Sequence, residues 1–173
     1  GGDWSDKGIT GTERFIQRVY DLLQEYISVK DVSAIASADI SALQGSEKTV
    51  YRKVNQTIAK YEAEMENFRF NTAIAALMEL LNELKEHLAG CSAPMQKYAL
   101  ERFVLMTAPL APHFGEEAWN MLGYSDSVYK KPVWFSADTS ALAEDTIQYA
   151  IQVNGKLRNT MPFAVEASEE EIK

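Results

Sequence analysis

Apolar residues recur every three to four positions along the first two thirds of the chain, which is the spacing typical of amphipathic α-helices. This pattern predicts helices over residues 10–28, 46–66, 68–88, 93–107 and 112–122. The third is the most regular, because its apolar residues share one face: Phe70, Ala73, Ile74, Leu77, Leu80, Leu81, Leu84 and Leu88. Amphipathic helices in such a succession predict an all-α bundle whose neighbouring helices are mostly antiparallel.

Glycine and proline residues separate these predicted helices. Gly90 follows the third helix and suits a helix C-cap, whereas Pro94 lies in the first turn of the fourth. Pro112 interrupts the helical pattern and begins the fifth helix. The segment 28–44, rich in Ser, Ala and Asp, predicts a long connection with one short helical turn around residues 35–43.

The periodicity changes in the last third of the chain. Residues 124–146 predict an extended connector, and beyond it apolar residues alternate with polar ones on both sides of Asn154 and Gly155, a strong hairpin signal. A strict two-residue turn would pair Ile151 with Arg158 and mix apolar and charged side chains on one face. A bulged connection keeps the odd-numbered apolar sets together, so we expect a short, bulged β-hairpin.

Composition places the chain among ordinary soluble globular domains. It has 173 residues, of which 46% are hydrophobic and 24% charged. No run of about 20 apolar residues is present, so we expect no membrane span and a cytoplasmic location. Cys91 is the only cysteine, which excludes a disulfide within the chain and a thiolate metal cluster.

The sequence contains little that predicts catalysis. His87 and His113 are far apart, and neither has a Cys, Asp or His partner at metal-ligand spacing. The phosphate-binding pattern GxxxxGK[ST], the dinucleotide pattern GxGxxG and the hydrolase pattern GxSxG are all missing. We therefore expect no catalytic residue and no metal site in these residues.

The net charge of -8 disfavours nucleic-acid binding by the chain as a whole, but the charges are segregated. Lys48, Arg52, Lys53 and Lys60 follow one another without an intervening acid. On a helical wheel these cations and Gln56 span about 140°, whereas the apolar stripe occupies roughly 200–300°. Such a face can neutralise phosphates. A solvated face paired with neighbouring acids fits the same spacing, so both readings stay open.

Two smaller basic groups have the same ambiguity. Arg14 and Arg18 are one turn apart in the first helix and could contact phosphates, but Asp21 is close enough for an intrahelical ion pair. Lys156 and Arg158 flank an apolar residue of the predicted hairpin and point away from its apolar set. Either solvation or contact with RNA explains this second pair.

Four strings resemble a known family. NTAIAALMELLNEL at 71–84 closely resembles the central helix of the anticodon-binding domain of class I aminoacyl-tRNA synthetases for aliphatic amino acids. GTERFIQRVYDLL at 11–23 resembles the helix that enters this domain, and LMTAPLAPHFGEEAWNMLG at 105–123 resembles its closing helix. IQVNGKLRNTMPF at 151–163 resembles the start of the small C-terminal domain of leucyl-tRNA synthetases, and this hairpin string selects the leucine enzymes.

The resemblance covers nearly the entire chain. It implies a helical tRNA-binding bundle over 1–124, a connector over 125–146 and the truncated start of a small C-terminal α/β domain over 147–173. The parent enzyme would use ATP with Mg to attach leucine to tRNA(Leu). The family's HIGH and KMSKS signatures and its editing domain are missing, so we expect no cofactor and no chemistry here. The implied partners are tRNA(Leu) and the catalytic domain of the same polypeptide, with no membrane and no DNA.

The resemblance also selects candidate tRNA contacts. The family's basic positions match Arg14, Arg18, Arg52, Lys53, Lys60, Lys156 and Arg158. The contacts implied are with the body and stem of the tRNA, with anticodon bases largely unread. The sequence departs from the family at Asn55 and Gln56, where a histidine and a lysine are common, so this face is less cationic. The alternative function is a helical protein-interaction adaptor whose acidic surface meets a basic partner.

Overall fold

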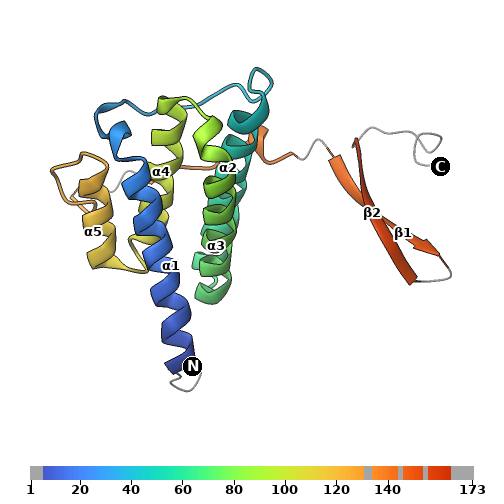
Figure 1. Ribbon diagram of the computed structural model, residues 1–173, viewed down its shortest axis with the longest axis horizontal. Coiled ribbons are helices and arrows are strands. Elements are labelled where there is room, and N and C mark those ends of the chain that lie inside the picture. Colours follow the sequence, from blue (N-terminus) through green and yellow to red (C-terminus); the bar gives the residue numbers. More distant parts are fainter. Residues whose placement is uncertain (1–5, 131–133, 144–145, 154–155, 165–173) are drawn as a thin grey trace.

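The computed structural model describes residues 6–130, 134–143, 146–153 and 156–164. Within these residues, helices come first and a two-stranded antiparallel hairpin follows (Figure 1). The α-helices are α1 (Asp6–Glu25), α2 (Gly45–Glu66), α3 (Phe70–His87), α4 (Ala93–Thr107) and α5 (Pro112–Met121). The short 3-10 helices are η1 (Ile27–Asp31), η2 (Leu88–Gly90) and η3 (Thr139–Ala141). The strands are β1 (Thr146–Val153) and β2 (Lys156–Ala164).

The apolar stripes of the helices form one core. The α2 helix packs along α3 and α4, and α5 packs against α1 and α4 (Figure 1). Leucines of α3 and the aromatic and aliphatic residues of α4 are buried where these helices meet, so that Leu77, Leu80 and Phe103 are fully inaccessible. The mainly α class and the helical bundle are therefore confirmed. Phe70, which the pattern placed on the apolar face, is 44% exposed.

The helix boundaries differ from the prediction where local signals are weak. The fourth helix has the predicted bounds, but α1 begins at Asp6 and ends at Glu25, followed by the unpredicted η1. The α3 helix ends in a 3-10 turn, and Gly90 lies inside that turn. Its lack of a side chain serves packing, because a Cβ there would lie 2.6 Å from the Ser46 Oγ.

The long connection between α1 and α2 contains the predicted turn. The amide of Ala42 donates to the Asp39 carbonyl at 3.0 Å, and the amide of Leu43 donates to the Ile40 carbonyl at 3.3 Å. After α5 the chain crosses the bundle to its α2 side, where the hairpin begins (Figure 1). The connector is not wholly extended, because η3 interrupts it.

The two strands are antiparallel, and a bulge follows the two residue pairs next to the turn. Val153 pairs with Lys156 and Gln152 with Leu157, after which the register shifts between Ile151 and Gln152. Arg158 has no Cα partner, so Ile151 lies opposite Asn159. Beyond the bulge the odd-numbered residues of both strands are paired, for example Tyr149 with Met161. Asn154 and Gly155 lie outside the described residues.

Candidate nucleic-acid interface

The outer face of α2 carries the cations that the sequence grouped together. Val50, Val54 and Ile58 are fully buried on the opposite side of this helix. Lys53 is half-buried and Lys60 is exposed, with 26% and 44% of their side chains accessible. The helix therefore separates an apolar face from a cationic one, as its sequence pattern predicted.

A single acid from α3 faces these cations. The Glu79 Oε2 lies 3.5 Å from the Nζ of Lys53 and 3.6 Å from the Nζ of Lys60. The carboxylate is 54% exposed, so solvent and salt screen both pairs and each contributes little to stability. Two cations share one acid, which leaves a local positive excess available to an anionic partner. Both readings of this face, ion pairing and phosphate contact, are thus compatible with the same residues.

Replacement of Glu79 by glutamine should strengthen binding of tRNA to this face. The substitution keeps the shape of the side chain but frees Lys53 and Lys60 from a competing carboxylate, so we expect a gain of about 0.2–1 kcal/mol, the usual strength of exposed pairs. A titration with tRNA over a range of salt concentrations measures it. Glu117→Gln, on the exposed side of α5, makes the same change in net charge elsewhere. An equal gain in both variants would show that only net charge matters.

The arginines of α1 lie on the other side of α3. The Nη2 of Arg18 donates to the Asn82 Oδ1 at 2.6 Å, which fixes this side chain across the α1–α3 contact. Asp21, which the sequence offered as its ion-pair partner, instead accepts from Gln17 at 2.8 Å. Arg14 lies one turn earlier and is exposed. Solvent reaches both arginines, so both remain accessible to a large ligand.

The order of the helices brings these basic groups together. The α3 helix lies between α1 and α2, with Asn82 toward α1 and Glu79 toward α2 (Figure 1). The cations of α1 and α2 therefore flank the exposed side of α3. We call this surface the α3 strip, and define it by Arg14 and Arg18 of α1 and by Lys53 and Lys60 of α2, together with the half-buried Arg52 that precedes Lys53 on the same helix.

The remaining two candidates lie elsewhere. Lys156 begins β2, and Arg158 is the residue that the bulge leaves without a Cα partner. Both belong to the hairpin, which follows the connector on the α2 side of the bundle (Figure 1). The structure therefore groups them with each other and not with the α3 strip.

Asn55 has a structural role that the sequence did not indicate. The resemblance treated it as a cation missing from the outer face of α2, but it is 1% exposed. Its Nδ2 donates to the Tyr51 carbonyl at 2.8 Å and to the Tyr98 hydroxyl at 3.1 Å, and its Oδ1 accepts from the Asp138 amide at 2.9 Å. Asn55 is thus a buried polar node that holds the connector on α2 and α4.

A second hydrogen-bonded side chain holds the same segment. The Tyr51 hydroxyl donates to the Asp138 Oδ2 at 2.7 Å and accepts from the Ala38 amide at 3.1 Å. The bond from Tyr51, with a further one from Ser140, lowers the pKa of Asp138. These contacts hold the connector on α2 at Asp138, just before η3.

Lys97 is a buried cation that the sequence analysis did not single out. It is 2% exposed, and its Nζ donates to the carbonyls of Lys30, at 3.1 Å, and Leu122. It also lies 4.6 Å from the centre of the Tyr124 ring. Burial lowers the pKa of this amine. The side chain links the ends of η1 and α5 to α4. Its helical position, three residues before the buried Leu100, was the available sequence signal.

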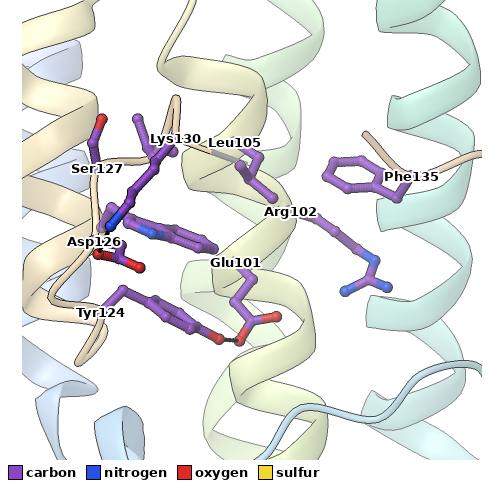
Figure 2. A pocket seen from close by; sticks show the side chains of 10 residues that line it. Glu101, Arg102, Leu105, Tyr124, Asp126, Ser127, Lys130 and Phe135 are labelled. Carbon is purple, nitrogen blue, oxygen red and sulfur yellow. Dashed lines mark hydrogen bonds and ion pairs between the residues drawn. The ribbon is translucent and has the colours of Figure 1, made fainter. Parts of the chain in front are cut away.

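A cavity of about 390 Å³ lies between α4, α5 and the start of the connector (Figure 2). Its charged groups already have partners: Glu101 accepts from the Tyr124 hydroxyl, and Lys130 pairs with Asp126 at 2.6 Å. Arg102 turns away from this cluster toward Phe135, as Figure 2 shows. The lining provides packing surface and paired charges, and the hydroxyl of Ser127 donates to the Glu116 carboxylate.

The other reactive side chains do not form a centre either. Cys91 is buried, and burial with the nearby charge of Glu47 raises the pKa of its thiol to about 11, so the thiol stays protonated at neutral pH. Among the residues described here, no three His, Cys, Asp or Glu side chains are grouped as metal ligands. Within the same residues, no helix is long and apolar enough to cross a membrane.

Comparison with known proteins gives this geometry a family. The sequence profile described as the anticodon-binding domain of tRNA ligase matches residues 47–173. The chain is 39% identical to a leucine-tRNA ligase of Geotalea daltonii over 175 residues, which cover 99% of the chain and 21% of the relative. It is 40% identical to that of Pseudoalteromonas atlantica over 176 residues, covering 99% of the chain and 20% of the relative.

A solved structure agrees with the sequence relatives. The ternary complex of the Agrobacterium radiobacter LeuRS with tRNA and LeuAMS superposes with a TM-score of 0.81 at 30% identity, covering 99% of this chain and 22% of that one. The chain thus spans about one fifth of the length of the proteins it matches. The resemblance of the bundle strings is confirmed. The chain belongs to the family of anticodon-binding domains of tRNA ligases, of the type found in leucine-tRNA ligases.

Proposed function

We propose that this chain is the tRNA-binding part of a cytoplasmic leucine-tRNA ligase, which uses ATP with Mg to attach leucine to tRNA(Leu). The observation that carries the proposal is the cationic surface of the α3 strip. The chain that bears it is similar over 99% of its length to a leucine-tRNA ligase. The related Agrobacterium structure contains tRNA by its description. ATP and the reacting groups belong to the catalytic domain of the parent polypeptide, so the residues described here bind and position RNA.

The α3 strip would act through phosphate contacts. Arg14 and Arg18 on one side, and the α2 cations on the other, are spaced along two helices rather than focused on one point, which suits a backbone of regularly spaced charges. Phosphate contacts fix position and register but do not read sequence. The proposed contacts therefore lie on the body and stem of the tRNA, and Glu79 would exchange its lysine partners for phosphates.

The hairpin would provide a separate contact. We assign residues 147–173 to the start of a small C-terminal α/β domain, joined by the connector 125–146 to the bundle 1–124. Lys156 and Arg158 would meet the tRNA from this domain. The hydrogen bonds of Asn55 and Tyr51 with Asp138 support the assignment, because they hold the connector on the bundle before the hairpin begins.

The combined substitution Arg52→Ala and Lys53→Ala in the full-length ligase tests the proposal. Loss of two cations should raise the tRNA Michaelis constant by roughly 5- to 50-fold. The slope of the logarithm of the binding constant against the logarithm of the salt concentration should become shallower by about two. Formation of leucyl-adenylate in the absence of tRNA, measured by pyrophosphate exchange, should persist, because its chemistry lies in another domain.

A matched control removes the same charge from other surfaces. Lys30→Ala with Lys130→Ala replaces two exposed lysines outside the α3 strip, and should change the tRNA Michaelis constant by less than about twofold. Equal effects of both double variants would contradict a specific interface. If the parent protein did not bind tRNA even at low salt, the protein-interaction adaptor would be favoured instead.

A further inference from the structure

The turn between α2 and α3 exposes two phenylalanines. Phe68 is 79% accessible and Phe70 is 44% accessible, and their rings meet edge to face with centres 6.0 Å apart. Most large apolar side chains of the bundle are buried, so a pair of exposed aromatic rings at one turn is unusual for it. Adjacent exposed apolar side chains commonly mark a surface that another macromolecule covers.

The backbone of this turn adds a second observation. Phe68 has a φ of 56°, and among the described residues it alone combines a side chain with a positive φ. The turn is closed by the Arg69 amide, which donates to the Glu64 carbonyl at 2.8 Å. Glycine or asparagine is the residue favoured at such a helix end, since a bulky residue is strained there. Phe68 nevertheless adopts this conformation, and its ring projects into solvent and does not pack in the core.

The charges around the two rings argue against RNA as the partner. Arg69 forms a two-pronged pair with Glu64, at 2.7 Å from Nε and 3.0 Å from Nη2, so the one cation of the turn comes together with an acid. Glu66 is exposed beside it. An apolar tip with a net negative border repels a polyanion, and fits a protein surface that offers an apolar pocket with a basic rim.

The position of the tip favours a surface that is joined to the beginning of α1. The α2–α3 turn lies at the same end of the bundle as the beginning of α1, and η1 lies at the opposite end (Figure 1). Ile9, near the start of α1, is also 46% exposed. Relatives are about five times as long as this chain, so most of their polypeptide lies outside it. A domain joined to the first residues of α1 would sit beside Phe68 and Phe70.

We propose that Phe68 and Phe70 form a docking tip that packs into an apolar, basic-rimmed pocket of the catalytic domain in the same polypeptide. This inference rests on the proposed function, because it requires a parent ligase with a catalytic domain at this end. Docking at the tip would hold the α3 strip at a fixed distance from the catalytic domain, and would thereby align bound tRNA with it.

Hydroxyl-radical footprinting of the full-length ligase and of the 173-residue chain tests the docking directly. Phe68 and Phe70 should be labelled at least fivefold less in the full-length enzyme without tRNA than in the chain alone. Ile27, 43% exposed at the opposite end of the bundle, provides the reference and should be labelled equally in both. Equal labelling of the phenylalanines would overturn the proposal. Protection that develops only when tRNA is added would also overturn it, and would assign the tip to RNA.

The variant Phe68→Asn separates docking from folding. Asparagine tolerates a positive φ, so the melting temperature of the 173-residue chain should not fall. In the full-length enzyme, labelling of Phe70 should rise to the level of the isolated chain, and transfer of leucine to tRNA should slow about tenfold, while leucyl-adenylate formation persists. Ile27→Asn is the matched control. Unchanged transfer and unchanged labelling of Phe70 would refute docking, whereas an enzyme that forms no leucyl-adenylate before mutation would refute the proposed function.

Discussion

Replacement of Asn55 by alanine should lower the free energy of unfolding by about 3 kcal/mol, because it leaves the Asp138 amide and the Tyr98 hydroxyl without their partner. Each buried polar group that loses its hydrogen bond costs about 1–3 kcal/mol. The missing amide volume adds a small cavity, since the side chain is 1% exposed. Urea denaturation followed by circular dichroism measures the change.

The same substitution should also loosen the connector. Asp138 keeps its bond from the Tyr51 hydroxyl but loses the contact that anchors its backbone. We expect faster hydrogen exchange at the amides of 134–138 than the global loss of stability explains. Gln56→Ala, at the next position of α2, removes an amide of similar chemistry from a half-exposed site and should change stability by less than about 0.5 kcal/mol. Similar losses in both variants would contradict the role of Asn55 as a buried node.

The helices could be predicted because their signals are local. Pro94 and Pro112 fix the beginnings of α4 and α5, and the spacing of apolar residues fixes which sides are buried. The start of α1 at Asp6 has no apolar stripe to mark it, so the pattern begins later. Phe70 follows the spacing of a buried residue yet lies exposed, since it is the first residue of α3 and the core does not reach the end of the bundle.

The candidate interface could be predicted only in part. The helical wheel separates cationic from apolar residues within α2, but the approach of Glu79 to Lys53 joins residues 26 positions apart. The bond from the Asp138 amide to Asn55 spans 83 positions, and that from Lys97 to the Lys30 carbonyl spans 67. Such contacts depend on the packing of the bundle, which the short-range spacing of residues does not reveal. For this reason the sequence assigned Asn55 to the outer face of α2, although the structure buries it in a hydrogen-bonded network.

Gly123→Ala should be the most destabilising of the glycine substitutions, with a loss of about 3–5 kcal/mol in the free energy of unfolding. Gly123 has a φ of 93°, which strains any residue that has a side chain. A Cβ there would also lie 2.6 Å from the Lys30 carbonyl oxygen and 3.2 Å from the Lys30 carbonyl carbon. That oxygen already accepts from the buried Lys97, so the backbone of η1 has little freedom to retreat.

Other glycines separate the two causes. Gly45 has a φ of 53° with nothing within 4 Å of a new Cβ, so alanine there should cost only the conformational strain, about 1–2 kcal/mol. Gly115 lacks a positive φ, but a Cβ would lie 2.6 Å from the Ala108 Cβ and 2.7 Å from its Cα, so alanine should separate α4 from α5 at a cost of about 1–3 kcal/mol. Gly11, within α1 and open to solvent, has neither constraint, and alanine should stabilise by roughly 0.5–1 kcal/mol. If strain and overlap act independently, the loss at Gly123 should approach the sum of the losses at Gly45 and Gly115. A loss at Gly123 no larger than that at Gly45 would mean that the Lys30 backbone moves aside, and that Lys97 does not hold it.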